Sequence, residues 1–262
     1  MLAVVAVRTV STVLLLLAYF RLTGVSIAMP GRERRIAVQI GILFCLGTYL
    51  INAAFAVIQV PLAVLILYLW PAITTGASWA LGRERFRWRI LFGLLFAFSG
   101  VGLSLNVEFS AAQWKGVVLA IGSALAWSGV FLLSEHFFRG RDTRPASFTM
   151  LVTAAAIFAA LCAVSGDLAM PSSASGWAGL STMPFFYAFA LIGLFVAISS
   201  IGASKSGFYM NFEPIASVLL AVPILGQTLA PIQLAGGALV ITALFLFRPL
   251  RTGPEPARAS AR

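Results

Sequence analysis

The sequence predicts an all-α fold, a polytopic bundle of membrane-spanning helices, and three observations lead to this prediction. Of the 262 residues, 60% are apolar and 10% are charged, whereas soluble domains have about 25% charged residues. Apolar runs of about 18 residues or more recur along the whole chain, and each is long enough to cross a bilayer as a helix. Basic residues gather in alternate connections between these runs, which is typical of multi-pass membrane proteins.

We expect nine spans, each formed by one apolar run. The polar segment after the last run, residues 249–262, is expected to be a disordered tail. In chain order the spans cover roughly residues 2–20, 36–53, 59–80, 89–106, 115–134, 146–165, 184–203, 207–225 and 231–247.

The connections between the spans predict the orientation in the membrane. Of the 18 Lys and Arg residues, 16 lie after odd-numbered spans, on one side of the membrane. The other side has only Lys115, and Arg8 lies within the first span. Because cytoplasmic loops are rich in Lys and Arg, we expect a multi-pass protein of the cytoplasmic membrane with its C-terminus in the cytoplasm. The 16 residues are Arg21, Arg32, Arg34, Arg35, Arg83, Arg85, Arg87, Arg89, Arg139, Arg141, Arg144, Lys205, Arg248, Arg251, Arg258 and Arg262.

Sliding the sequence along itself by 143 residues reveals an internal repeat. The segment "YLWPAITTGASWALGRERFRWRILFG" then falls on "NFEPIASVLLAVPILGQTLAPIQLAG", so that Pro71 meets Pro214 and Gly93 meets Gly236 without a gap. Spans 1 to 4 fall on spans 6 to 9, and span 5 has no counterpart.

The repeat predicts two domains and a tail. Residues 1–106 would form a first repeat of four helices, and residues 115–248 a second repeat of five. We therefore expect a further helix upstream of Met1, which would give ten spans with both ends in the cytoplasm. A complete repeat has an odd number of spans, so the two repeats would be inverted relative to each other, as in many secondary transporters.

These paired segments resemble the drug/metabolite transporter superfamily, specifically its EamA-domain permeases. The resemblance lies in a proline within the fourth helix of each repeat, a Gly-Glu pair at its end and a glycine-rich fifth helix; "AWSGVFLLSE" resembles the first helix of a repeat. It implies ten helices in the bacterial inner membrane and efflux of a small metabolite, with proton coupling as one option. This chain departs from the pattern at Arg83, inserted between Gly82 and Glu84, and at Gln227, which replaces the glutamate.

Glu213 is the first candidate for a residue that acts in transport. It lies deep in the eighth span, where an ionisable group faces protein or a water-filled cavity, and it can bind a cation or take up a proton. A structural carboxylate, satisfied by backbone amides or an Arg, is the alternative. Spacing places Tyr209, Glu213 and Ser217 on one helix face, and the repeat pairs that face with Trp70, Thr74 and Ser78 as the walls of one cavity.

Arg8 is the second candidate, because it is a cation inside the first span. Its guanidinium could bind an anionic group such as a substrate carboxylate in a bidentate manner. Alternatively it snorkels to the surface or pairs with a neighbouring helix, and Glu213 is one candidate partner.

Two prolines and four aromatic residues complete the candidate site. Pro71 and Pro214 each remove one backbone hydrogen bond deep in paired spans, so each is either a hinge beside a ligand or a static kink. An aromatic cage for a cationic or planar substrate, or else ordinary packing, would be formed by Trp127, Trp70, Tyr49 and Tyr187.

Other classes of function have little support. The net charge of +10 comes from the loop arginines rather than from a basic surface that could bind nucleic acid. Cys45 and Cys162 lie in apolar runs and read as buried hydrophobes, and His136 is expected in a polar loop, so we expect no metal site and no cofactor. No nucleophile and base pair is present to indicate an enzyme.

The sequence therefore predicts a secondary transporter that moves a small metabolite, amino-acid-like or otherwise polar or amphipathic, across the cytoplasmic membrane. The expected partners are this solute, the lipid bilayer and, as a candidate, a second copy of the chain. The alternative is an N-terminally truncated, non-transporting membrane protein or an assembly partner, because a bundle without one spanning helix exposes surfaces meant for protein contacts.

Overall fold

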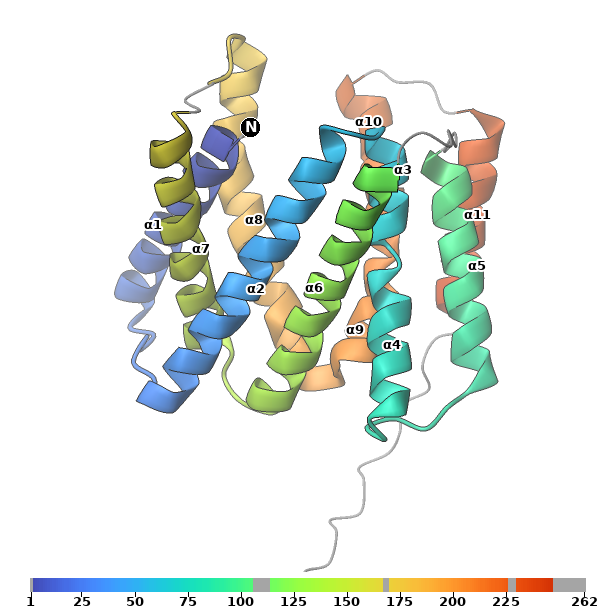
Figure 1. Cartoon of the computed structure of the whole chain (residues 1–262), viewed down its shortest axis with the longest axis horizontal. Helices are drawn as coiled ribbons and strands as arrows, with labels where there is room; N and C mark the ends of the chain where they lie inside the picture. The colour runs from blue at the N-terminus through green and yellow to red at the C-terminus, as the bar shows by residue number, and fades with distance from the viewer. Residues whose placement is uncertain (1, 106–113, 167–169, 226–229, 247–262) are drawn as a thin grey trace, which may run out of the picture.

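The computed structural model describes residues 2–105, 114–166, 170–225 and 230–246, and these residues form helices joined by short connections. Figure 1 shows the helices side by side in one bundle. The predicted tail, 249–262, lies outside the described residues. The helices are α1 (Leu2–Thr23), α2 (Gly31–Phe55), α3 (Val60–Leu67), α4 (Trp70–Ala80), α5 (Trp88–Leu105), α6 (Trp114–Phe138), α7 (Arg144–Ser165), α8 (Ala174–Ile201), α9 (Ala203–Met210), α10 (Phe212–Leu225) and α11 (Pro231–Leu246).

The predicted fold class, a polytopic helical bundle, is confirmed. Each of the nine predicted spans corresponds to one helix or to two consecutive helices, and the third and eighth spans are the two that are divided. Six described segments are long and apolar enough to cross a membrane, and Trp88–Leu103 and Pro231–Phe245 are shorter apolar helices. The chain is thus built to be surrounded by lipid.

Two details of the prediction are wrong. The seventh span begins at Ala174 rather than near residue 184, because Ser173 caps the helix by accepting a hydrogen bond from the Gly176 amide, and Pro184 is tolerated inside it. His136 lies in the last turn of α6 rather than in a loop. Apolar length therefore located the cores of the spans but not their ends.

The helix bounds recur at the offset of 143 residues found in the sequence. Adding 143 to the bounds of α3 gives 203–210, which are the bounds of α9, and adding it to α2 gives 174–198, against 174–201 for α8. The images of α1, α4 and α5 agree with α7, α10 and α11 within two residues at each end. Among the described helices, α6 is left without a counterpart.

Helices that the repeat makes equivalent also pack against each other: α1 lies along α7, and α5 along α11. A Cβ added at Gly100 of α5 would lie 2.7 Å from the Gly236 carbonyl oxygen and 2.7 Å from Val240 Cγ2. Gly100 and Gly236 therefore lie where α5 and α11 pack closely, as small residues commonly do between membrane helices.

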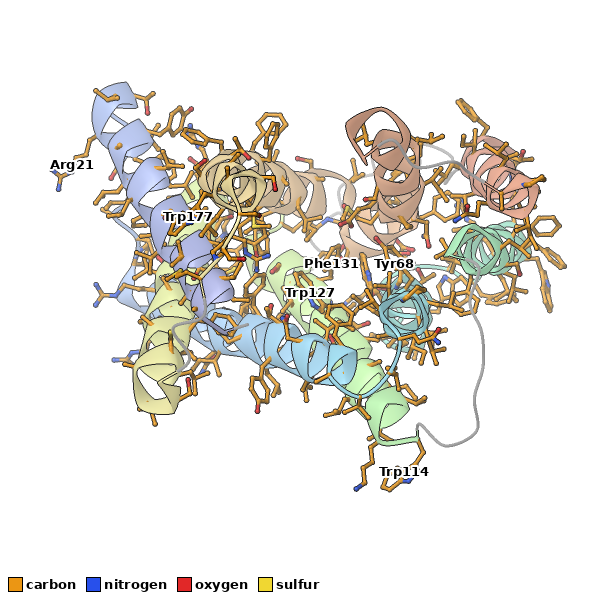
Figure 2. The ribbon with its side chains drawn as sticks, turned by 90° about the horizontal axis from the view of Figure 1, so that it is seen from above. Arg21, Tyr68, Trp114, Trp127, Phe131 and Trp177 are labelled. Atoms are coloured by element: carbon orange, nitrogen blue, oxygen red, sulfur yellow. The ribbon has the colours of Figure 1, made fainter. Side chains whose placement is uncertain are left out.

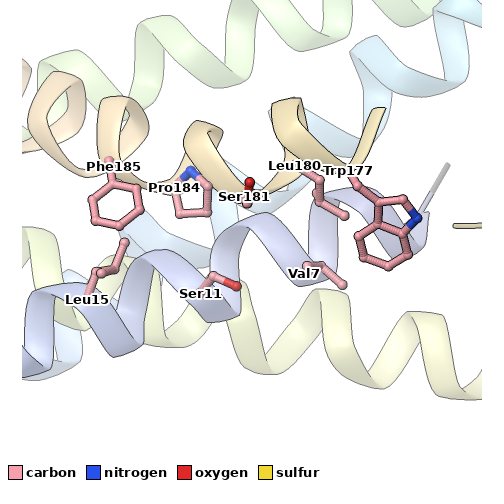
Figure 3. A pocket seen from close by; sticks show the side chains of 8 residues that line it. All are labelled: Val7, Ser11, Leu15, Trp177, Leu180, Ser181, Pro184 and Phe185. Carbon is pink, nitrogen blue, oxygen red and sulfur yellow. The ribbon is translucent and has the colours of Figure 1, made fainter. Parts of the chain in front are cut away.

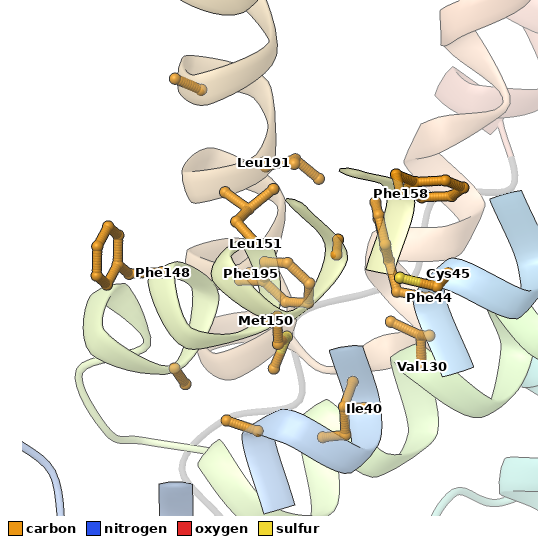
Figure 4. Close-up of a cluster of buried hydrophobic side chains, with 14 of the residues drawn as sticks. Ile40, Phe44, Cys45, Val130, Phe148, Met150, Leu151, Phe158, Leu191 and Phe195 are labelled. Carbon is orange, nitrogen blue, oxygen red and sulfur yellow. The ribbon is translucent and has the colours of Figure 1, made fainter. Parts of the chain in front are cut away.

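The largest apolar core lies where α1, α2, α6, α7 and α8 meet (Figure 4). Phe131, Phe138 and Phe158 are among its fully buried side chains. Cys45 and Cys162 are free and buried, as predicted. A second, smaller cluster joins α3, α5, α10 and α11 through Leu65, Tyr68, Val101, Ile215 and Val240.

Polar contacts tie the helices together at the end of the bundle where the arginine-rich connections lie. Arg141 pairs with Glu33 between the α6–α7 connection and α2, and the Gly140 amide donates to the Ser199 carbonyl of α8. Glu135 of α6 is buried, pairs with Arg139 at 2.7 Å and lies against Gly202, the residue that joins α8 to α9. Gly202 has φ +92°, a conformation that residues with a Cβ rarely adopt.

Gly100→Ala should destabilise the bundle by about 1–3 kcal/mol, because the new methyl group would overlap the backbone of α11. The measurement is unfolding of the full chain in detergent, followed by circular dichroism. Gly76→Ala in α4 is the matched control, since nothing lies within 4 Å of a Cβ there, and it should leave stability equal or slightly higher. Equal stability of Gly100→Ala and wild type would disprove the close approach of α5 and α11.

Candidate functional site

The candidate site lies where two helices are interrupted in the middle of the bundle. The chain segment of the third span stops as α3 at Leu67 and resumes as α4 at Trp70, and that of the eighth span stops as α9 at Met210 and resumes as α10 at Phe212. Leu67 and Met210 lie four residues before Pro71 and Pro214. A proline cannot donate to the carbonyl four residues earlier, so each helix ends where its hydrogen-bonding partner is lost.

Hydroxyl groups bind the start of α4, directly after the first interruption. The Trp70 carbonyl accepts a hydrogen bond from Thr74 Oγ1 at 2.7 Å and another from Ser128 Oγ of α6 at 2.9 Å. The Trp70 ring is buried and packs against Phe131 of α6, with ring centroids 4.2 Å apart. Helix α6 therefore holds the start of α4 in place.

The second interruption is satisfied by a side-chain amide. Asn211, between α9 and α10, is 2% exposed. Its Nδ2 donates to the carbonyls of Phe208 at 2.9 Å and Gly207 at 3.3 Å, which are at the end of α9. The residue that joins the two helices thus also caps the first of them.

The two interruptions are linked across the bundle. The Tyr68 side chain, at the end of α3, lies beside the Glu213 side chain in the first turn of α10. Glu213 is exposed, and no ion pair joins it to any described residue.

Contacts between α4 and α9 strengthen this link. Thr75 Oγ1 and Ser204 Oγ, both buried, are 3.0 Å apart and hydrogen-bonded. A Cβ at Gly207 would lie 3.0 Å from the Trp70 ring, so the ring lies directly on the α9 backbone. The close approach depends on small residues, as is common between membrane helices.

Arg8 packs against the aromatic ring of Tyr187, with the guanidinium carbon 4.3 Å from the ring centroid. Tyr187 lies near the middle of α8 (Ala174–Ile201) and within electrostatic reach of Arg8, Cys45 and Glu213. Arg8 and Glu213 do not form an ion pair with each other, so the pairing considered from the sequence is not found.

The other predicted site residues divide into buried and exposed groups. Trp70, Thr74 and Ser78 are buried, so they are packed between helices rather than open to a cavity. Tyr209 and Ser217 are exposed. Tyr209 lies in α9, and Glu213 and Ser217 lie in α10 beyond Asn211, so the single helix face expected for the three residues stays a prediction; Ser217 Oγ donates to the Glu213 carbonyl.

The structure does not bring the four predicted cage aromatics into ring contact with one another among the described residues. Trp127 is half-buried and meets the ring of Phe44 at 5.1 Å, Trp70 meets Phe131, and Tyr187 meets Arg8. Tyr49 is 47% exposed. Viewed along the bundle, Tyr68, Trp127 and Phe131 lie near its centre (Figure 2).

Sequence reasoning missed Tyr68, Asn211 and Ser128. A signal existed for the first two, because the offset of 143 places Tyr68 on Asn211, one residue in each interruption. No pattern in the sequence indicated that Ser128 of α6 would reach the Trp70 carbonyl, since the contact joins residues 58 positions apart.

A separate groove runs between α1 and α8 (Figure 3). Its lining is mainly apolar, with two serines and no charged side chain, so it includes neither Arg8 nor Glu213. The lining residues are Val7, Ser11, Leu15, Trp177, Leu180, Ser181, Pro184 and Phe185. No group of three or more His, Cys, Asp or Glu side chains that could hold a metal ion occurs within the described ranges.

Fold and site together define a multi-pass helical membrane protein with interrupted helices and with charged residues, Arg8 and Glu213, inside its spans. Residues 1–106 and 114–248 match the EamA-like transporter family. The chain belongs to this family of membrane transporters, and a lipid bilayer is its environment.

Individual relatives are more distant. The chain is 27% identical over 193 residues to the uncharacterized transporter YvbV of Bacillus subtilis (strain 168), a match that covers 69% of this chain and 60% of YvbV. It is 23% identical over 222 residues to the uncharacterized transporter YyaM of the same organism, covering 79% of this chain and 72% of YyaM. A crystal structure with 21% identity has the same fold, with a TM-score of 0.77, covering 94% of this chain and 86% of that one.

The hydrogen bond between Thr75 and Ser204 should be measurable by a double-mutant cycle of Thr75→Val and Ser204→Ala. Hydrogen bonds between membrane helices contribute about 0.6 kcal/mol on average, and up to about 1.7, so we expect a coupling of that size in unfolding of the full chain. Pairing Thr75→Val with Ser181→Ala, at the distant α1–α8 groove, serves as the control and should give additive effects. Additive effects for Thr75 and Ser204 would mean that the bond does not hold α4 to α9.

Proposed function

We propose that this protein is a secondary transporter that exports a small amino-acid-like or otherwise polar or amphipathic metabolite across the cytoplasmic membrane. The observation that carries the proposal is the proximity of Tyr68 to Glu213, which brings together two interrupted helices of a chain in a transporter family. Interrupted helices near mid-membrane commonly form substrate and ion sites, and alternating access moves one repeat against the other.

Two inverted repeats, residues 1–106 and 115–248, are the proposed moving parts. The recurrence of helix bounds at an offset of 143 residues supports this division. Pro71 and Pro214 would then act as hinges, since the lost hydrogen bonds let each half-helix turn separately. Pairing with a second copy of the chain stays a prediction.

Glu213 is the proposed coupling residue. A carboxylate inside the membrane is unfavourable when charged and unpaired, so its proton or a cationic group of the solute would enter and leave with each cycle. The Tyr68 hydroxyl can donate to the charged form of Glu213 and reorient when the carboxyl group is protonated. The proposed cycle thereby links proton uptake to the contact between the two interruptions.

Glu213→Gln should abolish solute-driven proton movement, by at least tenfold, because an amide cannot exchange a proton but keeps the size and hydrogen bonding of the carboxyl group. The assay uses proteoliposomes of the full chain that contain a pH-sensitive dye, with single amino acids as solutes. Glu84→Gln, a carboxylate in the α4–α5 connection, should behave as wild type. Unchanged proton movement in Glu213→Gln would remove this residue from the coupling step, and no solute movement in wild type would favour a non-transporting protein.

The orientation can be tested with introduced cysteines, because both native cysteines are buried. Ser172→Cys, in the exposed α7–α8 connection, should react with an impermeant maleimide on intact cells. Arg85→Cys, in the exposed α4–α5 connection, should react only after permeabilisation, since arginine-rich connections face the cytoplasm. The reverse pattern would place the C-terminus outside.

A further inference from the structure

Arg8 has no acidic or hydrogen-bonding partner for its side chain in the described part of the chain. Its Nε is buried without a hydrogen bond, and no described residue accepts a hydrogen bond from, or forms an ion pair with, its guanidinium group. The only contact of that group with a described side chain that compensates its charge is the face of the Tyr187 ring. An aromatic face compensates only part of a cation's charge.

The depth of Arg8 makes this lack of a partner significant. Arg21, at the end of α1, is exposed and can reach the lipid headgroups. Arg8 lies about 20 Å from Arg21 and about 9 Å from the start of α1, at 1.5 Å per residue, and its guanidinium group contacts Tyr187 in the middle of α8. A cation within the hydrocarbon region is unfavourable even on lenient scales, so a residue kept there calls for an anion.

We propose that Arg8 binds a carboxylate group of the transported solute, with the Tyr187 ring as the surface that orients the guanidinium plane. The proposal rests on the transport function proposed above and names the chemical group that the site recognises. A guanidinium group presents two parallel N–H donors that match the two oxygens of a carboxylate. Stacking on Tyr187 leaves the edge of the guanidinium group available for that bidentate contact.

Charge balance favours a carboxylate over a phosphate. One carboxylate neutralises Arg8, whereas a phosphate monoester carries about −1.5 to −2 charges at neutral pH and would leave negative charge inside the bilayer. Glu213 increases that penalty, because it is a second acid within reach of Tyr187. The Arg8 site therefore fits a solute with a single carboxylate group.

Binding can be tested on the purified full chain in detergent with sets of compounds that share a carbon skeleton. Each set has a carboxylate, its neutral amide, the corresponding amine and the amino acid; one set is 4-methylpentanoate, 4-methylpentanamide, isoamylamine and leucine, and a second is built on 3-phenylpropanoate. A rise in Tm with concentration gives the Kd. In at least one set the compounds with a carboxylate should bind, and the amide and the amine should bind at least tenfold more weakly.

Variants of the two residues then assign the contact. Arg8→Gln should weaken carboxylate binding at least tenfold without affecting binding of the amide or the amine. Arg8→Lys should weaken carboxylate binding less, because lysine keeps the positive charge but lacks the two parallel N–H donors of the guanidinium group. Tyr187→Phe keeps the ring and should bind as wild type, whereas Tyr187→Leu should bind more weakly. Arg21→Gln, at the exposed end of the same helix, is the matched control. Circular dichroism shows whether Arg8→Gln is folded. If it is not, Arg8→Lys still tests the contact, because it keeps the positive charge.

Several results would overturn the proposal: equal binding of amide and carboxylate, unchanged carboxylate binding in a folded Arg8→Gln, preference for methyl phosphate, or no binding by any carboxylate. Flux in proteoliposomes separates this outcome from failure of the proposed function. If amines or amides are transported and carboxylates are not, the proposed transport function is retained and the proposed carboxylate site is rejected. If no compound moves, the transport proposal falls as well.

Discussion

Satisfaction of backbone polar groups inside a bilayer is the constraint on which the rest of this structure depends. Hydrocarbon offers no hydrogen-bonding partners, so a broken helix at membrane depth is tolerated only where protein or enclosed water replaces the lost bonds. Polar side chains bind the backbone at both interruptions, in different ways. Ser128 and Thr74 donate to the Trp70 carbonyl at the first, and the Asn211 amide donates to the last carbonyls of α9 at the second.

This difference follows from the arrangement of the helices. Helix α6 lies against α3 and α4 and brings Ser128 to the first interruption. By the repeat offset, α6 has no counterpart among the described helices, and the second interruption is satisfied by a residue of its own segment. Tyr68 and Asn211 are equivalent by this offset, yet their side chains have different partners. Tyr68 lies beside Glu213 of α10, whereas Asn211 donates to a carbonyl of α9, the helix that it ends. Pseudo-symmetry of the backbone has not required symmetry of the site.

Much of the fold could be predicted from the sequence, because membrane helices are specified by apolar length and by loop charge. The positions of Pro71 and Pro214 also predicted where the backbone bonding would be lost, and the helices end four residues before each. Helix ends at residues 174 and 138 were missed, since caps and short polar turns extend a helix beyond its apolar run.

The side-chain contacts of the site could be predicted far less well. A helical period of four placed Tyr209 with Glu213, but it assumed a continuous helix, whereas Tyr209 lies in α9 and Glu213 in α10. Contacts such as Tyr68 with Glu213, or Arg8 with Tyr187, join residues far apart in the chain. They depend on how helices are rotated about their axes, which periodicity in one span does not determine.

Gly202 joins α8 to α9, and a rotation of the backbone there would move the far end of α9. A Cβ at this position would lie 2.8 Å from Glu135 of α6, and the residue would have to adopt φ +92°. The connection between α8 and α9 therefore has room only for glycine and packs directly against α6. Helix α9 extends from this connection for 8 residues, or about 12 Å. A rotation of about 10° at Gly202 would therefore move the far end of α9, at Asn211, by about 2 Å. A displacement of that size exceeds the distance range of a hydrogen bond, so a small turn at one end of the bundle would change how the second interruption meets the first.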